Sequence, residues 1–171
     1  MLHIYWGFGK GKTSALNGSA IRAKGAGMRV AYYRFLKGRP SSENEILKLV
    51  GVPPVHFHYT GKFVIEMDQN EKEKTRKIVY EGLEQIKKTK DQFDVIIIDE
   101  ILDLVASSVQ LVSEQYLANF FKKLGIKKRE VLISGHVKLK HVFDLADLIT
   151  HFEPQKHYFN RGLKARQGIE F

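Results

Sequence analysis

A glycine- and lysine-rich segment near the start of the chain has the composition of a loop that binds phosphate groups. Gly7, Gly9 and Gly11 leave the backbone between them free to curl, with its N–H groups pointing inward toward phosphate oxygens. In a loop of this kind Lys12 reaches the outer phosphates and Thr13 binds magnesium. The chemistry predicted here is therefore the binding of a nucleotide through its phosphates.

The full phosphate-loop pattern GxxxxGKT asks for a glycine at position 6, where this chain has Trp6. The match is thus GKT with the first glycine displaced to Gly7. A structural tight turn is the alternative, but the apolar run at 2–6 predicts a strand before the loop, and the pattern from Thr13 onward predicts a helix after it. This context favours the phosphate loop. As a loop residue, Lys12 is expected to be exposed, so its replacement should abolish activity with little effect on stability.

A second motif, DVIIIDE, contains four consecutive apolar residues at 95–98. Such a run predicts a central parallel strand that is covered on both faces. Asp99 and Glu100 stand at its carboxyl end, the edge of an open α/β sheet where ligands bind and where the phosphate loop also begins. We expect a carboxylate here to hold magnesium against the phosphates. The alternative is that Asp99 caps the following helix.

The order of strand and helix patterns indicates the fold class. Apolar patterns and turn residues alternate along the chain, which predicts an α/β fold with a mostly parallel central sheet flanked by helices. Ser42 and Glu45 have the spacing of a capping box, and Gly125 ends a helix. Strands are expected at 2–6, 30–36, 55–59, 95–98, 131–134 and 148–152, and helices at 14–24, 42–49, 70–90, 113–124 and 139–145.

Two further segments have more than one interpretation. His56 and His58 share one face of a strand and could form a metal pair, but no third ligand is evident. The basic, glycine-containing tail at 156–171 is typical of a sheet edge or a surface clasp, and its last residues have the pattern of a short apolar strand.

Length and composition bound the class of protein. The 171 residues predict one compact domain over 1–171. The 28 Lys and Arg against 19 Asp and Glu give a net charge of +9, which attracts polyanions such as nucleic acid or a nucleotide triphosphate, or serves solubility alone. The absence of cysteine excludes disulfides and Cys-ligated metal sites. No targeting peptide or membrane-spanning run is evident, so we expect a soluble, cytoplasmic protein without membrane partners.

Several stretches together resemble one known family. GFGKGKTSAL, IRAKGAG, RFLKG, IIIDEI, FDLADLIT and the tail ending in QGIEF occur in the order and spacing of corrinoid adenosyltransferases of the CobA type, which are ATP:cob(I)alamin adenosyltransferases. The resemblance covers nearly the whole chain. It implies a RecA-like P-loop NTPase fold, a homodimer, and ATP, magnesium and a corrinoid as ligands.

The resemblance also implies a reaction at the nucleoside end of ATP, with the nucleotide reversed in the loop relative to ordinary NTPases. Cobalt(I) of the corrinoid attacks the 5′ carbon and triphosphate leaves, so no side-chain base is needed. Lys10, Lys12 and Thr13 then serve the leaving group, with Thr13 and Glu100 or Asp99 holding magnesium. A partner protein that reduces the corrinoid is also implied. By motif position, the nucleotide-binding residues are Gly7, Phe8, Gly9, Lys10, Gly11, Lys12, Thr13, Ser14 and Lys37.

The chain departs from the family pattern at several places. Arg34 replaces a glutamine before FLKG, and His136 stands where an arginine is common. Of an aromatic pair that some relatives place against the corrinoid, only Phe63 is present here, and the N-terminal segment of longer relatives is absent. We expect these departures to leave ATP binding intact and to affect corrinoid binding.

Two other functions share the same loop. A RecA-like NTPase stimulated by nucleic acid fits the basic charge, but the sequence lacks the interleaved aromatic and basic residues that stack bases, so a nucleic-acid partner is disfavoured. A regulator that binds ATP without turning it over is the third alternative.

Overall fold

The structure, a computed structural model, describes residues 1–37, 41–58, 62, 64–106 and 108–171. Within them, six strands form one sheet in the order β3-β2-β4-β5-β1-β6, and each pairing is parallel. The strands are β1 Leu2–Trp6, β2 Val30–Phe35, β3 Val55–Phe57, β4 Val95–Asp99, β5 Glu130–Gly135 and β6 Leu148–His151. The predicted α/β fold class with a parallel central sheet is confirmed.

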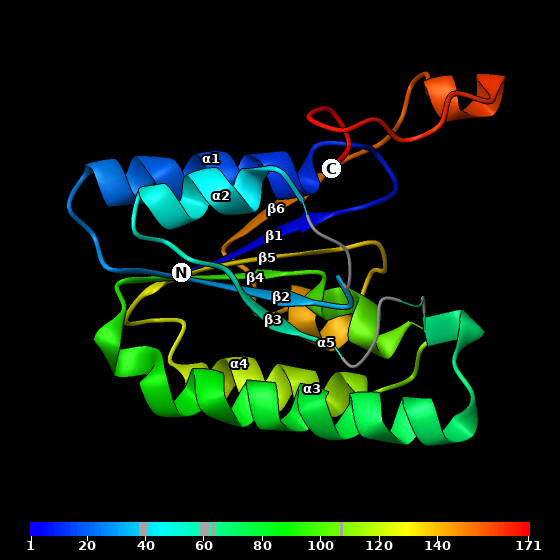
Figure 1. The fold of residues 1–171 in the computed structure, drawn as a ribbon. Helices are drawn as coiled ribbons and strands as arrows, with labels where there is room; N and C mark the ends of the chain where they lie inside the picture. Colours follow the sequence, from blue (N-terminus) through cyan, green and yellow to red (C-terminus); the bar gives the residue numbers. More distant parts are fainter. Residues whose placement is uncertain (38–40, 59–61, 63, 107) are drawn as a thin grey trace.

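Helices cover both faces of the sheet (Figure 1). Helices α1 and α2 lie on one face, and α3, α4 and the short α5 lie on the other. Their bounds are α1 Lys12–Gly25, α2 Glu43–Leu49, α3 Gln69–Thr89, α4 Glu114–Leu124 and α5 Lys140–Phe143. None of the helices in the described ranges is long and apolar enough to cross a membrane.

The apolar run of β4 is buried on both faces, as its sequence predicted. Val95 and Ile97 pack with the α1 and α2 side of the core, whereas Ile96 and Ile98 pack with the α3 and α4 side. Successive strand side chains point to opposite faces, so a strand between two helix layers must be apolar at every position. Burial of the run fixes where β4 ends, and so where Asp99 lies.

Most expected elements are present, with ends that differ by one or two residues. Helix α4 is capped by the Ser113 hydroxyl, which accepts from Tyr116 N at 3.2 Å, and it ends at Gly125 with φ of 78°. The expected capping box at Ser42 is wrong: its side chain makes no capping bond to α2. Its hydroxyl instead donates to the backbone oxygen of Phe171 in the tail at 3.1 Å.

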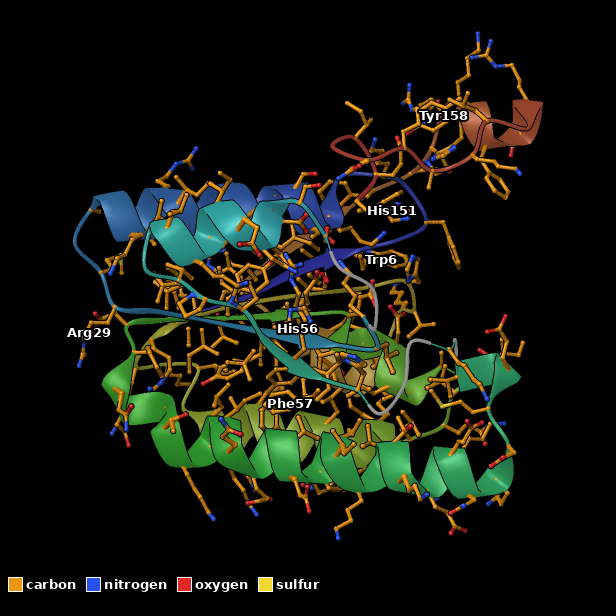
Figure 2. The ribbon with its side chains drawn as sticks, viewed as in Figure 1. Trp6, Arg29, His56, Phe57, His151 and Tyr158 are labelled. Carbon is orange, nitrogen blue, oxygen red and sulfur yellow. The ribbon has the colours of Figure 1, made fainter. Side chains whose placement is uncertain are left out.

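The tail corrects another expectation. Its last residues form turns and no strand, and the segment projects beyond the carboxyl edge of the sheet before returning to the phosphate loop (Figure 1). The tail was predicted to be either a sheet edge or a surface clasp. Its contacts with the phosphate loop and with Ser42, described below, agree with the clasp. It starts after β6, where His151 stacks on Trp6 of β1 with ring centroids 4.2 Å apart (Figure 2).

Candidate functional site

A cleft of about 740 Å³ opens at the carboxyl edge of the sheet. Its described lining comes from the phosphate loop with the start of α1, from residues 36–37 and residues between 41 and 46, from the carboxyl ends of β4 and β5, from Lys62 and from the end of the tail. Among the predicted site residues, 9–14, Lys37, Asp99 and Glu100 all line this cleft. Gly7 and Phe8 do not, and the Phe8 side chain is 75% exposed beside His136. The contact of each residue with nucleotide stays a prediction.

The loop between β1 and α1 is fixed by glycine conformations and by strand contacts. Gly7 and Gly11 adopt φ of 110° and 119°, which residues with a Cβ rarely adopt. Gly7 N donates to Gly135 O at 3.1 Å, and Gly9 N donates to Phe152 O at 2.7 Å. These two N–H groups hold the loop on β5 and β6 and are not free for phosphate. The first N–H groups of α1, which have no intrahelical acceptor, remain for an anion.

Lys12 is buried, which corrects the expectation of an exposed side chain. It is 9% exposed, and its Nζ donates to Gly7 O at 2.6 Å and to Gly9 O at 3.0 Å. Burial lowers the pKa of Lys12, and three nearby carboxylates oppose that shift. The ammonium group therefore stabilises the curled loop as well as lying in the cleft.

Thr13, Lys37 and Asp99 form one polar cluster behind the loop. Thr13 Oγ1 lies 3.1 Å from Asp99 Oδ2, and Lys37 Nζ donates to both of these atoms at 2.8 and 2.7 Å. The Ser134 hydroxyl donates to the other oxygen of Asp99, which is fully buried. Burial favours the neutral acid, but the Lys37 charge and the donated hydrogen bonds outweigh it and hold the pKa of Asp99 below its ordinary value. Asp99 does not cap a helix; it is the anionic centre of the cleft.

Glu100 extends the acidic side of the cleft, and the Asp103 carboxylate lies near it. Glu100 adopts a left-handed backbone with φ of 63°, and its N–H donates to Ser134 Oγ at 2.9 Å. Burial, reinforced by the charges of Asp99 and Asp103 and opposed by Lys37, raises the pKa of Glu100 to about 7. Asp103 accepts from the backbone N of His136 at 2.7 Å, and its other oxygen lies 2.9 Å from His136 Nδ1.

The donor set of this cluster fits a magnesium ion. A threonine hydroxyl and the carboxylates of Asp99 and Glu100 are the oxygen ligands that magnesium prefers, and the Lys37 ammonium between Thr13 and Asp99 shows that the position favours a cation. In the described part of the chain, no group of three His, Cys, Asp or Glu side chains could hold a metal. Magnesium commonly completes its coordination with water and substrate phosphates. His56 and His58 lie with ring centroids 6.1 Å apart and gain no third ligand.

Sequence reasoning did not assign several residues around the cleft. Arg34, noted only as a departure, is fully buried and donates to Asn17, Asn44 and Glu43 at 3.3, 2.6 and 2.9 Å. Asn17 could have been found, because it lies four residues after Thr13 on the same helix face. Ser134 and the tail residue Glu170 line the cleft, and Asp103 contacts the lining residue His136; these residues come from distant segments. Phe63, the expected corrinoid contact, lies outside the described residues.

Comparison with known proteins identifies the family. The model of the family described as ATP:corrinoid adenosyltransferase BtuR/CobO/CobP matches residues 1–171. The corrinoid adenosyltransferase CobA of Salmonella typhimurium is 30% identical over 170 residues, covering 98% of this chain and 84% of that protein. The corrinoid adenosyltransferases of Escherichia coli K12 and Pseudomonas aeruginosa are 29% and 27% identical, covering 98% and 100% of this chain and 84% and 83% of theirs.

Among solved structures, the replication initiator DnaA bound to AMPPCP and single-stranded DNA aligns with a TM-score of 0.45 at 12% identity. The alignment covers 89% of this chain and 40% of DnaA. The family model matches the whole chain, and the similar proteins of Salmonella typhimurium, Escherichia coli and Pseudomonas aeruginosa carry the same description. This chain therefore belongs to the ATP:corrinoid adenosyltransferase family.

Proposed function

We propose that this protein transfers the 5′-deoxyadenosyl group of ATP to the Co(I) centre of a corrinoid and releases triphosphate. One observation carries the proposal: the family match spans 1–171, and residues 9–14, Lys37 and Asp99 of that match line a single cleft. The cleft volume of about 740 Å³ falls in the range of small-molecule sites. Residues 1–171 would form one adenosyltransferase domain.

The reaction balances without a protein base. The electron pair of Co(I), which belongs to the substrate, forms the bond to C5′ of ATP, and the C5′–O bond breaks with its electron pair leaving on triphosphate. No proton is removed from the nucleophile, so the protein contributes position, charge neutralisation and exclusion of water. This agrees with a cleft whose described lining presents ammonium groups and carboxylates.

The cationic residues of the loop would bind the leaving triphosphate. Lys10 and Lys12 carry the charges, and the α1 N-terminus adds N–H donors. Thr13, with Asp99 or Glu100, would hold magnesium, which when bound neutralises further charge on the phosphates. Lys37 contacts two of these predicted ligands, and its ammonium group would add a further positive charge near the triphosphate.

Several finer features complete the proposal. A homodimer, a cytoplasmic location and an electron-donor protein that supplies Co(I) are inferred from the family resemblance. Phe63 is proposed as a corrinoid contact on the same basis. The reducing cytoplasm is the compartment in which ATP and a reduced corrinoid are both available.

An anaerobic assay tests the function. The purified protein is incubated with ATP, magnesium and chemically reduced cobalamin, and the products are separated by chromatography. Adenosylcobalamin and tripolyphosphate are expected in equal amounts. ADP as the main product, or turnover that requires added RNA or DNA, would instead support a nucleic-acid-dependent NTPase. ATP binding without either product would leave the protein a non-catalytic relative.

A further inference from the structure

The end of the chain contacts the tip of the phosphate loop. Lys10 Nζ lies 2.8 Å from Glu170 Oε1 and 2.9 Å from the Tyr158 hydroxyl, across about 150 residues of sequence. The ribbon shows the tail returning over the start of α1, with Tyr158 on the projecting part (Figures 1 and 2). Lysine at a loop tip otherwise keeps its full rotamer freedom, so these contacts restrict Lys10 specifically.

Glu170 is itself held by its own segment. Arg166 N donates to Glu170 Oε2 at 2.7 Å, and the Arg166 guanidinium reaches both carboxylate oxygens at 3.3 Å. The Tyr158 hydroxyl also donates to Glu170, and the Arg166 guanidinium lies 5.4 Å from the centre of the Tyr158 ring. The Glu170 side chain is 16% exposed, against 41% for Lys10. The Glu170 carboxylate is therefore held in place by its own segment, and it restricts the position of the Lys10 ammonium group.

The same segment is tied to the opposite wall of the cleft. The Phe171 carbonyl accepts from Ser42 Oγ, next to the start of α2, at 3.1 Å, and it also accepts from Gly168 N at 2.6 Å. Residues 168–171 line the cleft together with the loop. The tail thus bridges the two walls, and Glu170 sits at the loop end of that bridge.

We infer that Glu170 is a positioning residue of the triphosphate site, acting through Lys10. A lysine ammonium has three N–H donors; Glu170 and Tyr158 take two, which leaves the third for a phosphate oxygen at the cleft. The inference rests on the proposed function, because it assigns the polyanion in this cleft to a triphosphate. The C-terminal segment then belongs to the triphosphate site and acts on it through Lys10 Nζ.

Charge alone predicts the opposite effect, which makes the inference testable. A carboxylate next to a triphosphate repels it, so removing Glu170 would tighten binding if the tail contributed only its charge. If Glu170 positions Lys10, removing it frees a long side chain with many rotamers, which must be ordered again when the ligand binds, and binding weakens. The Glu170 contacts raise the pKa of Lys10, so the ammonium is charged at neutral pH in either case.

The test measures binding of inorganic tripolyphosphate and of ATP, each with magnesium, by titration calorimetry. Glu170→Gln should weaken both by roughly three- to tenfold. Glu153→Gln is the matched control: Glu153 is exposed, its backbone lies beside Gly9 and its substitution removes the same charge. The control should bind both compounds as the wild type does or slightly more tightly.

A double-mutant cycle separates positioning from a merely structural role. In a Lys10→Met background, Glu170→Gln should cause no further weakening, because the residue through which it acts is gone; binding should be unchanged or slightly tighter, because the carboxylate no longer repels the phosphates. Tyr158→Phe, which removes one partner of Lys10 and keeps the ring, should weaken binding less than Glu170→Gln, again only when Lys10 is present.

Unchanged or tighter binding in Glu170→Gln, or a loss that persists without Lys10, would overturn the inference. Failure of the wild type to bind tripolyphosphate would overturn the nucleotide site itself. A third outcome is that the double-mutant cycle behaves as expected while the wild type forms no adenosylcobalamin. That result would count against the proposed function alone.

Discussion

Lys37 and Asp99 form an ion pair in which Lys37 Nζ lies 2.7 Å from Asp99 Oδ2 and donates at 2.8 Å to the Thr13 hydroxyl. The Asp99 side chain is 1% exposed and that of Lys37 is 23% exposed. One ammonium group therefore stands against two of the oxygens that we propose as magnesium ligands. In the proposed site, lysine and metal would be alternative partners of the same buried charge.

Replacing Lys37 by methionine tests this exchange. Without lysine, the Asp99 charge loses its cation, and we expect the free energy of unfolding to fall by about 2–3 kcal/mol in the absence of metal. Magnesium should then raise the melting temperature of the variant more than that of the wild type, as measured by calorimetry with and without the ion. Lys48→Met removes an exposed ion pair with Glu45. It should change neither the free energy of unfolding nor the magnesium-induced shift in melting temperature measurably. Equal magnesium shifts in wild type and Lys37→Met would contradict the site.

Lys12 should contribute to both binding and stability. Lys12→Met keeps the apolar stem but removes the donor to the carbonyls of Gly7 and Gly9. We expect ATP affinity to fall roughly 10- to 100-fold, and the free energy of unfolding to fall by about 1–2 kcal/mol, because two carbonyls in a buried loop lose their partner. Calorimetric binding and urea unfolding measure the two effects. A variant that loses affinity at unchanged stability would show that the loop does not depend on these bonds.

The fold was predictable where the signal is local. The β4 run at 95–98 is apolar at every position because it is covered on both faces, and the core side of α3 appears in sequence as Val79, Leu83 and Ile86, all fully buried. The tail was not predictable in detail. Its turns are held by contacts such as Lys10 with Glu170, and no local pattern encodes a pair 160 residues apart.

The candidate site was likewise predictable only in part. The phosphate loop is contiguous in sequence, and the topology of a parallel sheet brings Asp99 to the same edge. The partners that set the chemistry of Asp99 and His136, namely Ser134 and Asp103, come from other elements. Ser42 shows how such contacts override a local pattern. Its spacing to Glu45 predicted a helix cap, yet its hydroxyl donates to the backbone oxygen of Phe171 instead.

Gly7 and Gly18 offer opposite outcomes for the same substitution. At Gly7, φ is 110° and an added Cβ would lie 2.5 Å from the carbonyl oxygen of Phe152, so Gly7→Ala must strain the loop or move β6. We expect a loss of about 2–3 kcal/mol in the free energy of unfolding and weaker ATP binding. Gly18 lies within α1 with open space around it, so Gly18→Ala should stabilise the protein by about 0.5–1 kcal/mol. Urea unfolding of both variants checks the pair, and a tolerated alanine at Gly7 would contradict the described loop.

Acid stability should depend on Asp94 at the edge of the sheet away from the cleft, where Arg29 lies (Figure 2). Hydrogen bonds from the Arg29 guanidinium and backbone N–H lower the pKa of Asp94 to about 2, from an ordinary value of 3.8. Because the folded-state pKa is depressed, the stabilisation is complete above the ordinary value and is lost as pH falls through about 2. Arg29→Gln should therefore be less stable than the wild type at pH 6, and the difference should shrink steadily between about pH 4 and pH 2. Urea unfolding across this range measures the difference, which would stay constant if Arg29 acted through packing alone. ATP binding at neutral pH should be unaltered, since the pair does not reach the cleft.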